Sequence, residues 1–428
     1  MQLLRPRSNF GRNVLTLASG TAVAQVIPVL ASPILTRLYY PNAFGILALY
    51  VPVVSVGAVL VTGRYELAIL IPRDDAEARD LLVLALALSV GLSTILALLL
   101  LASSPLAAAG FVPRVPSWAW IAPLGILLTA ATQSLGYWIN RQSRYRQLVT
   151  SRVLQSGSMF GVQTLGGALT ARAGVLVAGH VAGQLTAVVS LSRAAWRADG
   201  GLLRATSLEG LRRVASLHRR FPLFMVPGHL ANAASLQIPT VLLAAFFGPA
   251  IAGLYSLAER VLVLPSSLVG SAIGDVYRQA AAEAYNRTGN CRELYLQTLR
   301  RLALISILPC AIVIVGGPWL FSFAFGTAWR ESGALASVLA AMVFFQMISS
   351  PLSQTVLLAN MQRVDMAWQM ARLGVAAASI YTGYALFDDH VAAVALYAGG
   401  FAVLHMIHSL LQYRAACGVA PSPLPVRE

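Results

Sequence analysis

Lysine is absent from this chain of 428 residues, and charged residues of all kinds make up only 11% of it. All 31 basic residues are arginine, against 16 acidic residues, which gives a formal net charge of +15. A soluble globular domain carries about 25% charged residues. The shortage of charge therefore excludes an ordinary soluble enzyme and indicates an integral membrane protein.

Cysteine is also scarce, and the common catalytic and nucleotide-binding motifs are missing. The three cysteines, Cys291, Cys310 and Cys417, form no CxxC pair, so neither a disulfide nor a metal site is suggested. The sequence has no GxxxxGK(S/T) phosphate loop, no HExxH and no GxSxG. We therefore expect a protein that is not an enzyme and that uses no cofactor and no metal.

Long apolar runs fill most of the chain. Apolar residues make up 57% of it, and the mean hydropathy is +0.70. A bilayer core about 30 Å thick needs roughly 20 apolar residues of helix. This template predicts an all-α integral membrane protein with 12 transmembrane helices. The predicted spans are 14–35, 43–63, 81–102, 118–138, 148–169, 173–191, 222–247, 251–273, 302–325, 333–358, 367–387 and 391–412.

The arginines recur as short clusters between the apolar runs, and this distribution indicates the orientation of the chain. They concentrate in the alternate segments that are predicted to be cytoplasmic, whereas Arg37, Arg114, Arg172 and Arg330 fall in predicted external segments. Because short cytoplasmic loops carry an excess of arginine, we expect both termini in the cytoplasm. A nucleic-acid partner would instead require arginines gathered in one patch.

A basic polar stretch after the sixth predicted span divides the chain into two halves of six helices. The predicted domains are an N-terminal lobe at 1–200, an amphipathic basic linker at 201–220, a C-terminal lobe at 221–412 and a cytoplasmic tail at 413–428. The linker pattern is typical of a helix lying on an anionic inner leaflet. A PxxxG pattern opens both the second span, at Pro41, and the eighth, at Pro249. This repetition favours two lobes related by a pseudo-two-fold axis along the membrane normal, with a cavity between them.

Charged residues inside predicted spans are the first functional candidates, because each one is costly unless it faces a cavity or a partner. Glu259 and Arg260 lie about ten residues into the eighth predicted span. Consecutive helix residues diverge by about 100°, so at least one of the two must face a cavity or another helix. We predict that Arg260 contacts an anionic substrate, and an interhelical ion pair is the alternative.

Arg64 and Glu66 lie where the second predicted span should leave the membrane. Because the residues from Leu67 to Pro72 remain apolar, we expect the helix to extend and to hold both charges at the inner mouth of a cavity. The alternative is a solvated helix end with snorkelling side chains, and Arg37 at the outer end of the first span has the same two interpretations. Since the planar guanidinium fork suits phosphate oxygens, these arginines predict a cationic cavity for a phosphate-bearing substrate.

Two further features of the spans have a structural and a functional interpretation. Gly270 and Gly274 form a GxxxG pattern, which we interpret as a site of close helix packing. Four histidines in or near spans could relay protons near neutral pH, although buried, hydrogen-bonded histidines are more common. These histidines are His180, His229, His405 and His408.

Two segments of the sequence resemble the Wzx-type bacterial polysaccharide flippases. The first comprises Thr36-Arg37-Leu38-Tyr39-Tyr40-Pro41, Phe44-Gly45 and Gly63-Arg64-Tyr65-Glu66-Leu67-Ala68-Ile69. The second comprises Gly253-Leu254-Tyr255-Ser256-Leu257-Ala258-Glu259-Arg260, Leu264-Pro265 and Ile273-Gly274. Arg64 and Arg260 occupy positions that this pattern assigns to cationic contacts.

The resemblance implies a multidrug/oligosaccharidyl-lipid/polysaccharide exporter fold, whose two lobes alternate between inward-open and outward-open states. The implied substrate is an undecaprenyl-pyrophosphate-linked oligosaccharide, moved from the inner to the outer leaflet of the bacterial inner membrane for O-antigen (lipopolysaccharide), exopolysaccharide or capsule synthesis. Glu66 or Glu259 would couple transport to an ion gradient. The implied partners are membrane lipids and the polysaccharide polymerase machinery.

Some features separate the chain from related classes of protein. Ser32-Pro33 stands where the peptidoglycan-precursor flippases carry an Arg-Asp pair, and 12 predicted spans replace their fourteen, which favours a surface polysaccharide. A multidrug or small-cation antiporter of similar architecture is the alternative function, but it would hold its cation with acidic residues. A membrane glycosyltransferase or ligase would require catalytic carboxylates on an accessible loop, and the predicted external loops are short.

Overall fold

The computed structural model of the chain describes residues 26–108, 115–359 and 361–418. Every regular element among these residues is a helix, which confirms the predicted all-α class for this part of the chain. The predicted first span at 14–35 lies partly outside the described residues. Arg114 and most of the predicted tail at 413–428 also lie outside them.

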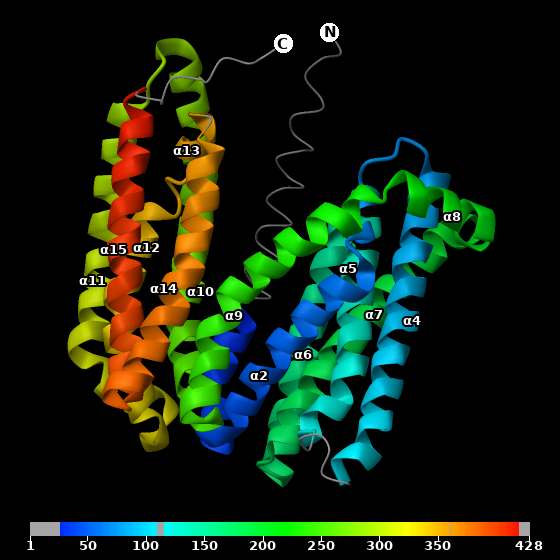
Figure 1. Cartoon of the computed structure of the whole chain (residues 1–428), viewed down its shortest axis with the longest axis horizontal. Coiled ribbons are helices and arrows are strands. Elements are labelled where there is room, and N and C mark those ends of the chain that lie inside the picture. Colours follow the sequence, from blue (N-terminus) through cyan, green and yellow to red (C-terminus); the bar gives the residue numbers. More distant parts are fainter. Residues whose placement is uncertain (1–25, 109–114, 360, 419–428) are drawn as a thin grey trace. The chain divides into compact units, whose positions relative to one another are not determined.

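The helices follow one another along the whole described chain (Figure 1). A helix at Val26–Leu38 comes first. It is followed by α2 (Pro41–Thr62), α3 (Tyr65–Ala68), α4 (Asp75–Ala108), η1 (Ser117–Ile121), α5 (Ala122–Arg141), α6 (Tyr145–Leu169), α7 (Ala173–Arg204), α8 (Leu208–Leu217), η2 (Phe221–Met225), α9 (Val226–Phe247), α10 (Pro249–Thr288), α11 (Arg292–Phe325), η3 (Thr327–Trp329), α12 (Arg330–Ser349), α13 (Gln354–Leu358), α14 (Gln362–Phe387) and α15 (His390–Ala416).

Eight segments of the described chain are long and apolar enough to cross a membrane. They are Pro41–Thr62, Asp75–Ser104, Ser117–Arg141, Ala173–Leu202, Phe221–Phe247, Arg292–Phe325, Thr327–Ser349 and His390–Ala416. Helices α6, α10 and α14, of 25, 40 and 26 residues, also exceed the roughly 20 residues that a bilayer requires, but they carry more polar side chains. The chain is therefore a multi-pass membrane protein, and the total of 12 spans stays a prediction.

Two compact units make up the chain, Met1–Ala234 and Ser235–Glu428, and the division falls within α9. In the first unit, α5 packs against α2, α4 and α7, and α6 lies along α7. In the second unit, α12 packs against α10, α11 and α15, and α14 lies along α15 (Figure 1). Each unit has its own core, which includes Leu81, Trp138 and Ile139 in the first and Tyr277, Tyr295 and Leu302 in the second.

The amphipathic segment of the basic stretch forms α8, which packs against α4 in the first unit. Its amino terminus is capped by Ser207, whose Oγ accepts a hydrogen bond of 3.1 Å from the Gly210 N–H. Val214 is fully buried in the core of the unit, whereas Leu208 and Leu217 are 77% and 64% exposed. Only part of the apolar surface of α8 is thus used within the unit, and the rest is available to a lipid surface.

The junction between α2 and α3 differs from the sequence prediction. The expected extension of the second span through Arg64 is wrong, because α2 ends at Thr62 and the next two residues adopt the left-handed conformation, with φ of 56° at Gly63 and 60° at Arg64. The Gly63 N–H donates to the Leu60 carbonyl at 3.2 Å. Glycine adopts this conformation without a steric penalty, and it commonly ends helices in this way.

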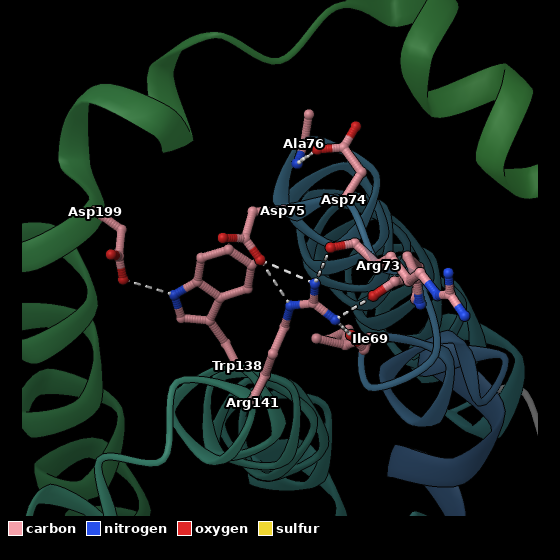
Figure 2. Close-up of polar contacts among 9 residues, drawn as sticks. Ile69, Arg73, Asp74, Asp75, Ala76, Trp138, Arg141 and Asp199 are labelled. Carbon is pink, nitrogen blue, oxygen red and sulfur yellow. Dashed lines mark hydrogen bonds and ion pairs between the residues drawn. The ribbon is translucent and has the colours of Figure 1, made fainter. Parts of the chain in front are cut away.

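Arg141 of α5 holds the chain that connects α3 to α4 (Figure 2). Its guanidinium donates to the backbone carbonyls of Ile69 at 3.0 Å and Pro72 at 2.7 Å. It also donates to the Arg73 carbonyl at 3.4 Å and to the Asp75 carboxylate at 2.8 Å. The five donors of one guanidinium thus satisfy several carbonyls of an irregular segment and fix the position of α3, which carries Glu66.

Asp199 of α7 connects the same end of α5 to α7. Its carboxylate accepts a hydrogen bond of 3.0 Å from the indole nitrogen of Trp138 (Figure 2). It also accepts two from the Arg144 guanidinium, at 3.0 and 2.9 Å. Bidentate pairs of this kind are among the stronger polar contacts in proteins. They complete a layer of partly buried charges at this end of the unit.

The predicted tenth span at 333–358 is interrupted in the structure. Helix α12 ends at Ser349, a turn occupies residues 350–353, and α13 begins at Gln354. Pro351 explains the break, because it has no N–H to donate and its ring clashes with the carbonyl one turn earlier. Irregular backbone is therefore placed next to α10, which packs against both α12 and α13.

We expect Arg141→Met to lower the free energy of unfolding by about 2 to 3 kcal/mol, because it leaves several carbonyls of the α3–α4 connection without a donor. Asp75→Asn is the matched control, since the Asp75 side chain is 58% exposed and such a pair contributes about 1 kcal/mol or less. Thermal unfolding of both variants in detergent checks this. Equal losses in the two would contradict a role for Arg141 beyond the exposed ion pair.

Candidate functional site

The first candidate cluster lies at the bend between α2 and α3. The backbone N–H of Arg64 donates to Thr62 Oγ1 at 3.3 Å, which supports the left-handed conformation of a non-glycine residue. Residues two apart on a continuous helix point in different directions and do not meet. Because the helix is broken here, the side chains of Arg64 and Glu66 can contact each other.

Arg64 joins two side chains in this cluster. Its Nη1 donates to Glu66 Oε1 at 3.0 Å, and its Nη2 contacts Nδ1 of His229 on α9 at 2.5 Å. The Glu66 side chain is fully buried and that of Arg64 is 14% exposed. A guanidinium can only donate, so Nδ1 of His229 must accept and the ring proton lies on Nε2. The structure thus brings Arg64 and Glu66 together and replaces the solvated helix end with a buried ion pair.

The Glu66 carboxylate is only partly satisfied. Its Oε2 is buried and has no hydrogen-bond partner among the residues that the structure describes. The Tyr137 side chain of α5 lies within electrostatic range of both Glu66 and Arg64. A buried ion pair is costly unless its remaining lone pairs are satisfied. A proton or a small cation on this oxygen would reduce that cost, so the cluster is suited to accepting positive charge.

Arg37 does not join this cluster. It lies near the end of the Val26–Leu38 helix, and its side chain is exposed and makes no hydrogen bond or ion pair within the described part of the chain. The 22 residues of α2 separate it from Arg64, a distance of roughly 30 Å at 1.5 Å per residue. The two arginines therefore lie beyond opposite ends of α2.

The second candidate cluster lies on α10, about three turns after its start. Glu259 and Arg260 are half-buried and interact electrostatically with each other. The side chains of Tyr255, one turn earlier, and of Tyr397, on α15, also lie within range of Glu259. The rings of the two tyrosines meet edge to face, with their centroids 6.4 Å apart. An acidic residue and an arginine thus occur together in this unit as well.

Arg372 on α14 is a further cationic group of the second unit that the sequence analysis did not select. Its guanidinium carbon lies 5.7 Å from the centroid of the Phe401 ring, and it interacts electrostatically with Tyr397 and His405. Arg372 lies inside the predicted span at 367–387. The rule for charges within spans that selected Arg260 would have found it.

His408 occupies a buried hydrogen-bonding environment on α15. Its Nδ1 lies 3.3 Å from Ser349 Oγ and 3.0 Å from Gln412 Nε2. The ring stacks on Trp368 at a centroid distance of 4.3 Å, and His405 meets the same indole edge to face at 5.2 Å. For His408, the structure supports the interpretation as a packed, hydrogen-bonded histidine.

The two clusters share one chemical property, an arginine whose charge is opposed by a carboxylate close in sequence. Arginine stays charged in a partly dehydrated site and presents a fork that matches phosphate geometry. A carboxylate can bind a proton or a cation. Among the described residues, no group of three or more histidine, cysteine or acidic side chains could hold a metal ion. The clusters are therefore suited to anion binding in competition with an internal carboxylate.

Comparison with known proteins gives a family match over most of the chain. A family described as polysaccharide biosynthesis protein matches residues 34–334. This range is well over half of the 428 residues. It includes all five residues selected from the sequence, which are Arg37, Arg64, Glu66, Glu259 and Arg260.

Two curated proteins of polysaccharide biosynthesis are similar in sequence. The teichuronic acid biosynthesis protein TuaB of Bacillus subtilis is 26% identical over 304 residues, which cover 70% of this chain and 61% of TuaB. The succinoglycan biosynthesis transport protein ExoT of Rhizobium meliloti is 28% identical over 136 residues, which cover 29% of this chain and 26% of ExoT. The matches thus span less than two thirds of the length of either relative.

The fold is similar to that of solved transporters. The inward-facing structure of a multidrug resistance MATE family transporter of the MOP superfamily matches with a TM-score of 0.67 and 14% sequence identity, over 91% of this chain and 93% of that one. A structure of MATE in the bent conformation matches with a TM-score of 0.53 and 12% identity, over 94% of both chains. At such identities the likeness concerns the fold alone. The chain therefore belongs to the polysaccharide biosynthesis protein family and has the fold of MOP superfamily transporters, as its two signature segments predict.

Proposed function

We propose that the protein is a flippase that moves an undecaprenyl-pyrophosphate-linked oligosaccharide across the bacterial inner membrane by alternating access. The observation that carries this proposal is the buried ion pair between Arg64 and Glu66, and the adjacent Glu259 and Arg260 are the corresponding combination in the second unit. Family membership and the relation to TuaB and ExoT support a substrate from polysaccharide biosynthesis.

The carboxylates compete with the substrate for the arginine side chains, and this competition allows the substrate to be released. A pyrophosphate that approaches Arg64 competes with Glu66, which already occupies one edge of the guanidinium. A proton or cation on Glu66 weakens this internal pair and leaves Arg64 available to the substrate. Loss of that charge restores the pair and displaces the pyrophosphate. In this mechanism Glu66 and Glu259 couple substrate binding to an ion gradient, and Arg260 has the same role as Arg64.

The orientation and surroundings of the protein follow from the same mechanism. We place both termini in the cytoplasm, with six-helix lobes at 1–200 and 221–412 joined by the basic linker at 201–220. The sugar headgroup would enter the protein, the polyprenyl chain would stay in lipid, and Arg37 would contact the substrate near the outer face. The product would supply the polymerase machinery of O-antigen, exopolysaccharide or capsule synthesis.

A multidrug or small-cation antiporter is the second candidate function, because Glu66 has an unpartnered buried oxygen among the described residues and the fold is similar to that of MATE transporters. A cation site, however, requires carboxylates in excess of arginines. Each carboxylate here has an arginine beside it, and the second unit adds Arg372. This balance of charge favours an anionic substrate.

Deletion of the gene should abolish the surface polysaccharide of the host and cause a lipid-linked intermediate to accumulate in the inner leaflet. Glycan staining and lipid extraction measure the two effects, and expression of the chain from a plasmid should reverse both. Drug accumulation should not change. An unchanged glycan profile in a strain without a second flippase gene would refute the proposed function.

Arg260→Ala should reduce glycan export by about tenfold or more, since a charge-assisted contact to phosphate contributes about 1.5 to 3 kcal/mol. Arg260→Lys should restore only part of the activity, because an ammonium cannot bind phosphate bidentately. The assay is complementation of the deletion strain at equal membrane abundance of each variant. Full rescue by lysine would show that only a positive charge is required.

Glu66→Gln should strengthen binding of undecaprenyl pyrophosphate by about tenfold and at the same time reduce export, because it removes the anion that competes for Arg64. Binding to the purified protein and complementation in cells give the two readouts. Glu77→Gln is the matched control, since Glu77 pairs with His218 at 2.8 Å and does not touch Arg64. Weaker binding by Glu66→Gln would instead assign the ion pair a purely structural role.

A further inference from the structure

A cavity of about 340 Å³ lies within the second unit, between α10, α12 and the turn that separates α12 from α13. This volume falls in the range of small-molecule sites, about 300 to 1,000 Å³. Most of the side chains around it are polar. The polar lining residues are Ser266, Arg278, Gln346, Ser350, Ser353 and Gln354.

The interrupted helix explains why polar groups gather at this position. The turn at 350–353 contains short-range hydrogen bonds, from the Leu352 N–H to the Ser349 carbonyl and from the Ser353 N–H to the Ser350 carbonyl, both at 3.2 Å. The apolar span Thr327–Ser349 ends immediately before this turn, so the polar side chains gather at the end of the span.

Gly270 and Gly274 form the wall of the cavity on α10. A Cβ atom added at Gly270 would lie 3.6 Å from Pro351 Cγ, and one at Gly274 would lie 3.5 Å from Pro351 Cα. These are ordinary van der Waals distances, so close backbone packing alone does not require the glycines. The GxxxG pattern, which we interpreted as a packing motif, also keeps space open beside the turn.

The chemistry of the lining matches neutral sugar hydroxyls. Serine hydroxyls and glutamine amides both donate and accept hydrogen bonds, as sugar hydroxyls do. Among the residues that the structure describes, the lining contains no acidic residue and no aromatic ring, and Arg278 is its one charged side chain. A drug cation would need carboxylates or aromatic faces, and a bare phosphate would need several cations. A glycan headgroup is the class of ligand that this set of groups fits.

The lining of the cavity on α10 begins at Val263, one turn after the acidic–arginine cluster. Glu259, Val263, Ser266 and Gly270 recur at spacings of three and four residues, which places them on the same side of the helix. Ser266 lies six residues beyond Arg260, a rise of roughly 9 Å along the axis. The lining of the cavity therefore begins on the helix face of Glu259, whereas Arg260 points about 100° away from that face.

We propose that this cavity binds the sugar headgroup of the transported lipid, with Gln346, Gln354 and the lining serines as ligands of the sugar hydroxyls. This inference rests on the proposed flippase function and assigns two parts of the substrate to two different sites. The arginine cluster holds the part that all such substrates share, whereas the cavity distinguishes one glycan from another.

The test compares two probes on the purified full-length protein. These are undecaprenyl pyrophosphate without sugar and the undecaprenyl-pyrophosphate-linked glycan extracted from the deletion strain of the host. Gln346→Met combined with Gln354→Met removes two amides at nearly constant side-chain volume. We expect this double variant to bind the glycosylated lipid about tenfold more weakly and to bind undecaprenyl pyrophosphate like the wild type. Gln279→Met, an exposed position on α10 outside the lining, is the matched control and should bind both probes normally.

The possible outcomes separate the cavity from the proposed function. If the wild type binds neither probe, the flippase proposal fails. If the wild type prefers the glycosylated lipid and the double variant keeps this preference, the function stands and the sugar site is overturned. An equal loss for both probes also overturns it. Should the double variant fail to fold, Ser266→Ala with Ser353→Ala must show the same selective loss, of about threefold, for the site to stand.

Discussion

The fold depends on one electrostatic constraint, that a guanidinium placed among apolar helices must keep a partner. Arg64 meets this requirement with the Glu66 carboxylate and His229, and Arg260 lies within electrostatic range of Glu259. An internal pair of this kind keeps the arginine in a defined position without lipid or water. Because such a pair is costly to bury, removing one partner without replacing it is strongly destabilising.

Breaks in helices position the polar groups of both units. Gly63 ends α2, so that Arg64 and Glu66 meet across a bend. Pro351 separates α12 from α13 and gives the second unit a polar turn beside α10. In each case one residue ends the helix. Gly63 does so by adopting the left-handed conformation, and Pro351 does so because it has no N–H to donate. The surrounding helices then satisfy or cover the exposed backbone, as the Arg141 guanidinium does after α3.

The geometry of arginine suits both the observed structural contacts and the proposed binding of an anion in this protein. In the charged layer of the first unit, Arg141 and Arg144 use several donors of one guanidinium to connect separate segments. In the candidate sites, the same geometry suits the oxygens of a pyrophosphate. An ammonium would provide charge in either place but not the fixed pair of parallel hydrogen bonds.

The sequence by itself determined the membrane class, the helical fold and the charged positions Arg64, Glu66, Glu259 and Arg260, because hydropathy and charge are properties of the linear chain. Family membership also followed from two short segments. Only the tertiary structure decided which of these charges meet. His229 lies 165 residues from Arg64 in the chain, and no local pattern relates them.

In the second unit too, and at the helix breaks, the sequence alone did not show which distant residues come into contact. The place of Arg372 beside Tyr397 and His405 depends on which faces of α14 and α15 are in contact. The expectation that a helix would run through Arg64 was wrong because hydropathy continues smoothly past a glycine that ends the helix. Long-range packing therefore decided the partners of the charges, since neighbouring positions on a helix point about 100° apart and the sequence alone does not say which direction faces a neighbour.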